Sequence, residues 1–234
     1  MALKQPVVNP LQRFCTRALL WLRRPFLLHR VRRPVIERLD GASFVLVPEV
    51  QNPVVFRSGA FFARMIAGIE PAVEGASALD MGTGSGICGV FAARRGHRVV
   101  AIDINPEAVR CARVNVLLNR LEGRVEVRQG DLFSPVQGEQ FDLVFFNPPF
   151  FRGEPKPDDL FDISWRSINV FERFANGLRA VLKPGGRALV LLSTDGDPQG
   201  MLTALRHQGF DIQKLIDRDF GNEIMTIYSA RPAQ

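Results

Sequence analysis

A short proline-rich element, residues 147–150, follows an apolar stretch at 141–146 and carries side chains suited to chemistry. Two successive prolines fix the backbone and donate no hydrogen bond. The Asn147 side-chain oxygen and the Pro148 carbonyl can therefore accept both hydrogens of one planar NH₂ group. Packing of Phe150 on the flat face of that group would orient its nitrogen toward an electrophile. The element is typical of a site that holds the nitrogen of an amide or aromatic amine so that it can attack an electrophile. The alternative is an ordinary turn after a buried strand.

A glycine-rich turn stands where a predicted strand at 77–81 passes into a helix. It has the sequence D-M-G-T-G-S-G over residues 80–86, and its glycines leave bare backbone against which a ligand can lie. Asp103 ends the next predicted strand, where its carboxylate can accept both hydroxyl protons of a ribose. Because residues 84–89 also satisfy the dinucleotide pattern G-x-G-x-x-G, the turn indicates an adenosine-type cofactor without naming it.

The elements that must position these residues follow from hydrophobic periodicity and turn signals. Strands and helices alternate after a hairpin around Asp40-Gly41, which predicts a doubly wound, Rossmann-like α/β fold with a mostly parallel sheet. Both motifs then stand at the carboxyl edge of that sheet. The predicted strands are 77–81, 98–103, 125–128, 141–146, 187–192, 212–217 and 223–229, and the predicted helices are 58–66, 85–95, 106–119, 167–182 and 199–207.

Local signals set the ends of these elements. Asn105 and Pro106 form an N-cap and first-turn pair for the helix that follows. Residues 183–186, Lys-Pro-Gly-Gly, predict a turn between the helix 167–182 and the next strand. The periodicity of that helix predicts a buried face made of Ile168, Phe171, Ala175, Leu178 and Leu182.

The composition is that of an ordinary globular domain, with 234 residues of which 46% are hydrophobic and 23% are charged. No stretch approaches about 18 uncharged apolar residues, so we expect no membrane-spanning helix. Three cysteines, Cys15, Cys88 and Cys111, and three scattered histidines fit neither a disulfide framework nor a metal site. We therefore expect no bound metal and a reducing, cytoplasmic location.

Positive charge is concentrated in an N-terminal arm. Residues 1–36 hold eight basic and no acidic side chains, although the whole chain has a net charge of only +6. Apolar residues recur there at helical spacing between arginines, which predicts a short basic amphipathic helix that ends at Pro25. Two interpretations stay open: the apolar stripe packs on the body, or the helix contacts RNA phosphates or an anionic lipid surface. The stripe consists of Leu11, Phe14, Ala18 and Leu22.

Four motifs, in their order and spacing, resemble those of a known family. They are D-M-G-T-G-S-G at 80–86, A-I-D-I-N-P at 101–106, Q-G-D-L-F at 129–133 and N-P-P-F at 147–150. The set is similar to that of class I S-adenosylmethionine-dependent methyltransferases of the amino-methylating branch. Within that branch the chain resembles the release-factor glutamine methyltransferases, in particular the short archaeal and eukaryotic kind, over about residues 50–230.

This resemblance implies a seven-stranded sheet whose last strand is antiparallel and S-adenosylmethionine as the cofactor. It also implies an N-methyltransferase domain at 49–234 that follows an arm and hairpin at 1–48. By the resemblance Asp103 would hold the ribose, and Asp131 with Leu132 would lie at the adenine amine. The implied cofactor-binding residues are Asp80, Gly82, Thr83, Gly84, Gly86, Asp103, Ile104, Asp131, Leu132 and Asn147. The implied catalytic residues are Asn147, which would bind the target nitrogen, and Pro148, Pro149 and Phe150, which would shape its pocket. Residues 55–59 resemble the family's cofactor-covering segment only loosely, so they are not included among the implied cofactor-binding residues.

Two substrate classes share this catalytic geometry. A protein glutamine, as in a release factor, is favoured because the segment 151–166 carries four acidic and three basic residues, which suits a phosphate chain poorly. The alternative is the exocyclic amine of guanine or adenine in rRNA, tRNA or DNA. Phe150 is in keeping with this alternative, because Tyr is usual at that position in the glutamine family and Phe also occurs in rRNA guanine methyltransferases. In that case the basic arm would guide RNA.

Two further hypotheses belong to other classes. One is a cofactor-binding module without transfer activity, and the other is an NAD-dependent oxidoreductase. The second needs a hydride-handling site, but the chain has no Tyr-x-x-x-Lys arrangement, and its single tyrosine, Tyr228, lies on the predicted terminal strand.

Overall fold

The computed structural model describes residues 10–233 apart from 71, 157–158, 160–161 and 163. Its centre is a seven-stranded sheet in the order β10-β11-β9-β6-β3-β4-β5. β11 runs antiparallel to both of its neighbours, whereas β9, β6, β3, β4 and β5 pair in parallel, as predicted. The strands are β3 (Ser77–Met81), β4 (Arg98–Asp103), β5 (Val125–Gln129), β6 (Phe141–Phe146), β9 (Leu182–Ser193), β10 (Phe210–Asp219) and β11 (Ile224–Pro232).

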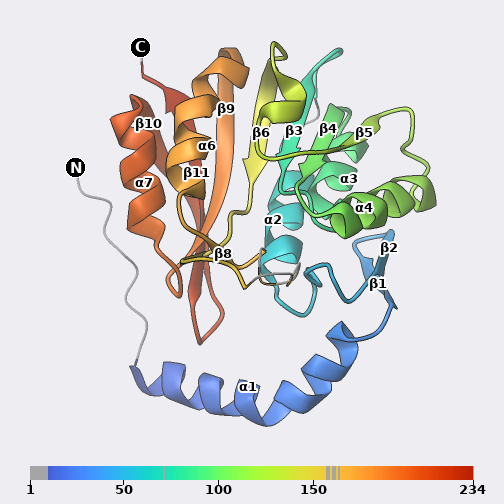
Figure 1. Ribbon diagram of the computed structural model, residues 1–234, viewed down its shortest axis with the longest axis vertical. Helices are drawn as coiled ribbons and strands as arrows, with labels where there is room; N and C mark the ends of the chain where they lie inside the picture. Colours follow the sequence, from blue (N-terminus) through green and yellow to red (C-terminus); the bar gives the residue numbers. More distant parts are fainter. Residues whose placement is uncertain (1–9, 71, 157–158, 160–161, 163, 234) are drawn as a thin grey trace.

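Helices cover both faces of this sheet, which defines a doubly wound α/β fold (Figure 1). One core contains side chains of α2, α3 and α4, and the other contains side chains of α6 and α7. The helices are α1 (Pro10–Val31), α2 (Ser58–Ala67), α3 (Ile87–Arg94), α4 (Pro106–Leu118), α6 (Val170–Leu178) and α7 (Pro198–His207), with short 3₁₀ turns at Ser134–Val136 and Arg179–Val181. Because β3 and β6 are covered on both faces, nearly all of their residues are buried.

Local sequence explains how several elements begin. Asp40 and Gly41 have φ values of 44° and 78°, which suit the tight turn between β1 (Val35–Leu39) and β2 (Ala42–Leu46). The Asn105 side chain accepts from the Glu107 backbone N–H at 2.9 Å, so Asn105 and Pro106 begin α4 as predicted.

The β1–β2 hairpin is anchored on α4. Asn115, fully buried, accepts from the Val45 N–H at 2.7 Å and donates to the Val45 carbonyl at 2.9 Å. Phe44 and Leu46 join the same core as α2 and α3. The division of the chain at residue 48 stays a prediction, and the hairpin packs as part of the body.

Two predictions about the segment 167–193 are wrong. Residues 166–167 form a short strand, β8 (Arg166–Ser167), that pairs with β7 (Phe151–Arg152), so the helix α6 starts later and Ile168 is exposed. Leu182 belongs to β9, where it pairs with Phe141, while Arg187 pairs with Leu143. The Lys-Pro-Gly-Gly sequence is therefore an irregularity within one long strand, because the sheet continues on both sides of it.

The N-terminal helix also differs from its prediction. α1 continues through Pro25 to Val31, and Figure 1 shows it as a curved rod set apart from the sheet. A proline removes one backbone donor, and in a helix surrounded by water the carbonyl left without that donor can be hydrated. The predicted stripe does not pack on the body, because Leu11, Phe14 and Leu22 are 72%, 71% and 68% exposed. Within the described residues, none of the helices is long and apolar enough to cross a bilayer.

Candidate active site

A cavity of about 320 Å³ lies at the carboxyl ends of β3, β4 and β6. These strands are neighbours in the sheet and run in parallel, so the residues that follow them meet at one edge. The predicted site residues that line the cavity are Gly82, Gly84, Asp103, Ile104, Asp131, Leu132, Asn147 and Pro149. The structure therefore brings both sequence motifs to one place.

The glycine turn presents its backbone to this cavity. Gly82 and Gly84 have φ values of 64° and 56°, a region that residues with a side chain rarely adopt. A Cβ atom on Gly84 would meet no atom within 4 Å, so its backbone borders open space. Gly86 serves a different purpose: a Cβ there would come within 3.2 Å of Ala112, so this glycine permits close approach of α4.

Asp80 and Thr83 lie beneath the turn and do not line the cavity. Asp80 Oδ2 accepts from the Thr83 hydroxyl at 2.6 Å and from the Gly89 N–H at 2.8 Å. Burial raises the pKa of Asp80 to about 6, although both of these hydrogen bonds act in the opposite direction. The carboxyl group thus holds the turn in shape from inside the fold.

Asp103 stands at the end of β4 with its carboxylate between two backbone donors. Its Oδ2 accepts from the Gly84 N–H at 2.8 Å, and its Oδ1 accepts from the Asn105 N–H at 2.9 Å. Burial raises its pKa, and these hydrogen bonds partly offset that effect. Each carboxylate oxygen has a further lone pair, so the fixed group can still accept from a ligand's hydroxyl groups.

Asp131 and Leu132 line the cavity beyond β5. Leu132 has a positive φ of 47°, and the Asp131 carboxylate pairs with the Arg173 guanidinium of α6. Ile104, Leu132 and Phe146 supply apolar surface beside the Asp103 carboxylate. One polar anchor next to apolar walls and bare glycine backbone suits a nucleoside, so the residues present fit S-adenosylmethionine.

Asn147 lines the cavity directly after β6. Its Nδ2 donates to the Ser58 hydroxyl at 3.4 Å. Its Oδ1 is buried and has no hydrogen-bond partner among the residues that the structure describes. A buried acceptor without a partner costs about 1–3 kcal/mol, so this oxygen is prepared to accept a hydrogen bond from a ligand.

Ser58, the first residue of α2, is a site residue that sequence reasoning missed. It follows Arg57, whose φ of 66° is unusual for a residue with a side chain. The Arg57 guanidinium donates to Asn222 Oδ1 at 2.6 Å and lies 4.8 Å from the centre of the Phe220 ring. The β10–β11 hairpin therefore fixes the segment that carries Ser58. The only sequence signal was the loose resemblance of residues 55–59 to a cofactor-covering segment.

The other residues of the N-P-P-F element are divided between the cavity and the core. Pro149 lines the cavity, whereas Pro148 and Phe150 do not. The Phe150 side chain is 7% exposed and belongs to the main core, and its carbonyl accepts from the Asp197 N–H at 3.1 Å. The aromatic ring at the cavity is that of Phe146, the last residue of β6.

Several lining residues come from segments that carry no motif. The loop after β2 contributes Glu49, Val50 and Gln51, and the region from β8 to α6 contributes Arg166, Ser167, Val170 and Arg173. Their positions depend on how β7 and β8 pair and on where α6 begins, which no local pattern predicted.

The chain belongs to the methyltransferase small domain family, whose model matches residues 63–208. With a fold and cavity of this kind, it is an S-adenosylmethionine-dependent N-methyltransferase. The sequence-based resemblance to class I methyltransferases is thus confirmed at the level of the family and of the cofactor.

Curated relatives divide between protein and RNA methyltransferases. A putative protein N5-glutamine methyltransferase of Methanocaldococcus jannaschii is 28% identical over 76% of this chain and 90% of its own length. The release factor glutamine methyltransferase of Clostridium acetobutylicum is 32% identical over 56% of this chain. The ribosomal RNA small subunit methyltransferase C of Alcanivorax borkumensis is 36% identical over 46% of it. The chain spans 51% and 29% of the lengths of the last two proteins.

Solved structures share the fold. A complex from E. cuniculi, responsible for methylation of the eRF1 translation termination factor, aligns with a TM-score of 0.58 and 22% identity, covering 79% of this chain and 99% of the solved chain. The ribosomal protein L11 methylase of Lactobacillus delbrueckii aligns with a TM-score of 0.56 and 19% identity over 80% of this chain and 84% of the solved chain.

Proposed function

We propose that this enzyme methylates the side-chain amide nitrogen of a glutamine in a protein, such as a translation release factor. The observation that carries the proposal is the buried Asn147 Oδ1, which has no hydrogen-bond partner in the described part of the chain. An NH₂ group donates two hydrogens: Asn147 Oδ1 would accept one, and the carbonyl of the adjacent Pro148 would accept the other, although Pro148 is not among the residues that line the cavity. The target nitrogen would then be held at the cavity that fits the cofactor.

This arrangement addresses the weak nucleophilicity of an amide. S-Adenosylmethionine supplies a methyl group on a positively charged sulfur. Transfer forms an N–C bond, breaks the C–S bond and releases one proton from nitrogen to water. Acceptors on both hydrogens favour the pyramidal form of the nitrogen, and the proton becomes acidic only as the N–C bond forms. Asn147 therefore acts by binding and orientation, and no general base is required beforehand.

The charges around the cavity favour a protein over a nucleic acid. Two arginines line the cavity, Arg166 and Arg173, and three acidic residues line it with them, Glu49, Asp103 and Asp131. Arg166 pairs with Asp162 at 3.3 Å, and Arg173 pairs with Asp131. Nucleic acids bind largely through cations that neutralise phosphates. Arginines already paired with carboxylates provide little of that attraction.

Some of the relatives support the same substrate class. The relative matched over 90% of its own length is named as a putative protein N5-glutamine methyltransferase. Two release factor glutamine methyltransferases are 32% and 37% identical to parts of this chain. We also propose a cytoplasmic location, in keeping with the unpaired cysteines Cys15, Cys88 and Cys111.

The test is transfer of a labelled methyl group from S-adenosylmethionine into lysate of cells that lack the enzyme. The labelled macromolecules are divided and digested with protease or nuclease. The proposal predicts that protease alone releases the label and that mass mapping finds one methylated glutamine. Label released only by nuclease would overturn it and assign a base amine instead.

Variants connect this activity with the site. Asn147→Ala should abolish transfer while leaving S-adenosylhomocysteine binding within a few-fold, because it removes the contact with the target and not those with the ribose. Asn176→Ala, at an exposed asparagine of α6, is the matched control and should keep full activity. Loss of cofactor binding in Asn147→Ala would contradict the role given to this residue.

A further inference from the structure

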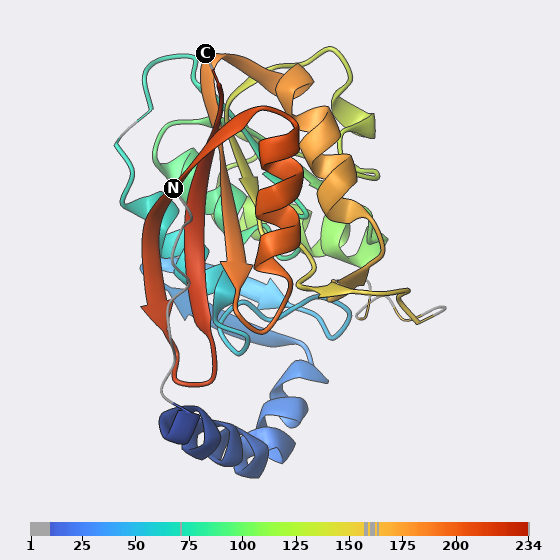
Figure 2. The ribbon, with the colours of Figure 1, turned by 90° about the vertical axis from the view of Figure 1, so that its left-hand side faces the viewer.

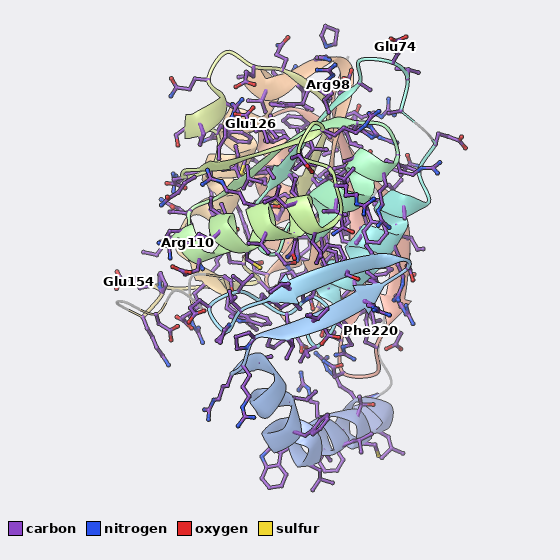
Figure 3. All side chains as sticks on the ribbon, turned by 90° about the vertical axis from the view of Figure 1, so that its right-hand side faces the viewer. Glu74, Arg98, Arg110, Glu126, Glu154 and Phe220 are labelled. Atoms are coloured by element: carbon purple, nitrogen blue, oxygen red, sulfur yellow. The ribbon has the colours of Figure 1, made fainter. Side chains whose placement is uncertain are left out.

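The helix α1 presents an apolar face to solvent. Phe14, Trp21, Leu22 and Phe26 are 71%, 69%, 68% and 65% exposed. At about 100° per residue these four side chains fall within an arc of about 140° on the helix. Figures 1 and 2 show α1 beyond one end of the sheet, and Figure 3 shows many of its side chains projecting away from the body. Large apolar side chains gathered on one exposed face indicate an interaction surface.

The opposite side of α1 is attached to the body, which fixes the direction of the apolar face. Arg13 and Arg17 donate to the Asp195 carboxylate, which follows β9, at 2.6 Å and 3.0 Å. The Thr16 side chain lies so close to Gly221 that a Cβ there would be 2.6 Å from its hydroxyl oxygen. On a helical wheel the arc that holds Arg13, Thr16 and Arg17 is centred about 160° from the centre of the apolar arc. The body therefore binds one side of α1 and leaves the apolar side uncovered.

The charge around this face indicates which kind of partner binds there. Residues 1–36 carry no acidic side chain, and although Arg13 and Arg17 bind Asp195, Arg32 and Arg33, just after α1, are exposed. A second copy on the same face would bring two such arms together, and like charges would oppose the contact. RNA would pair with the arginines, and its unpaired bases can stack on the aromatic rings, but it offers no apolar medium for Leu22. An anionic bilayer surface satisfies both groups, because it buries apolar side chains below the headgroups and attracts basic ones at their level.

We propose that α1 lies in the plane of an anionic lipid bilayer, with Phe14, Trp21, Leu22 and Phe26 inserted among the headgroups. β8, whose residues Arg166 and Ser167 line the cavity, lies at the end of the molecule where α1 is found (Figures 1 and 2). Binding in this way holds the catalytic edge of the sheet close to the membrane. The inference does not depend on which NH₂ group is methylated.

Flotation of the full chain with lipid vesicles tests this surface. Vesicles of phosphatidylcholine with phosphatidylglycerol should carry the protein upward, and vesicles of phosphatidylcholine alone should not. Phe14→Ala with Trp21→Ala should weaken binding at least about tenfold, because two aromatic side chains no longer insert. The matched control is Val114→Ala with Leu117→Ala, two exposed apolar residues of α4, and it should bind as the unaltered protein does.

The electrostatic part is tested separately. Arg32→Gln with Arg33→Gln should weaken binding to the anionic vesicles about 30-fold, which is about 2 kcal/mol at about 1 kcal/mol per basic residue near the surface. Raising the salt concentration should also weaken binding to the anionic vesicles, because dissolved ions screen the attraction between the arginines and the lipids. The chain has two tryptophans, so Trp165→Phe leaves Trp21 as the only one. The fluorescence of Trp21 in this variant should shift to shorter wavelength on anionic vesicles and be quenched by brominated lipid.

Several outcomes would overturn the proposal. One is no flotation with anionic vesicles, and another is equal flotation of the Phe14→Ala, Trp21→Ala protein with circular dichroism unchanged. Light scattering of the unaltered protein decides between this surface and a dimer. A dimer that the same double variant converts to a monomer would show that a second copy covers the face. Binding of an RNA oligonucleotide that depends on Trp21 while vesicles do not bind would assign the surface to nucleic acid.

Discussion

The buried Asp80 carboxyl makes folding stability depend on pH in a direction opposite to that of most aspartates. Burial raises its pKa from 3.8 to about 6, because water can no longer solvate the charged form. Below pH 3.8 both the folded and unfolded chains hold the proton, and this group contributes its full stability. As the pH rises toward 6, the unfolded chain loses the proton first, so the free energy of unfolding falls.

The size of this effect follows from the two pKa values. Their difference corresponds to about 3 kcal/mol, a large part of the 5–15 kcal/mol that stabilises a typical domain. Asp80→Asn removes the titration, and its amide oxygen can still accept from the Thr83 hydroxyl and the Gly89 N–H. The variant should therefore gain about 2 kcal/mol relative to the unaltered protein between pH 4 and pH 7, since part of the change already falls below pH 4.

Urea unfolding of both proteins at a series of pH values measures this change directly. A difference in unfolding free energy between Asp80→Asn and the unaltered protein that stays constant from pH 4 to pH 7 would refute the reasoning. Asp142→Asn is a control of opposite sign. Burial tends to raise the pKa of Asp142, but Lys183 at 2.7 Å and Ser77 outweigh it and lower the pKa overall. Asp142 thus adds stability that is present above its ordinary pKa and lost as the pH falls, so Asp142→Asn should destabilise more at pH 7 than at pH 3.

Two predictions concern the cavity. Ser58→Ala should lower kcat about twofold to tenfold, the worth of one neutral hydrogen bond, because Ser58 orients the Asn147 amide. Ser58→Ala should leave the Kd for S-adenosylhomocysteine within about twofold, and a loss of cofactor binding as large as the loss of kcat would show that Ser58 acts by another route. Asp103→Asn should raise the Kd for S-adenosylhomocysteine about tenfold to a hundredfold in calorimetry, because it would remove the charged group that we propose accepts from the ribose hydroxyls. Asp211→Asn, at an exposed aspartate of β10, is the control, and a change of less than twofold for Asp103→Asn would contradict its role.

Local sequence determined most of the fold. β3, β4 and β6 occupy the predicted ranges, because their residues read as buried strands between glycine and proline signals. The same reasoning placed the glycine turn, Asp103 and Asn147 at the carboxyl edge of a parallel sheet, and all three border one cavity. Periodicity could not predict the end of α1 or the start of α6, because both depend on the surroundings of the helix.

The tertiary structure alone decided which side chains of these motifs face the cavity. Asp80 and Phe150 belong to motifs yet lie in the interior, whereas Ser58, distant in sequence, contacts Asn147. Contacts of this kind join residues that lie far apart in the chain, and no local pattern records them. The same is true of α1: the sequence showed an apolar stripe beside arginines, but only the attachment of Arg13 to Asp195 showed that the stripe faces away from the body.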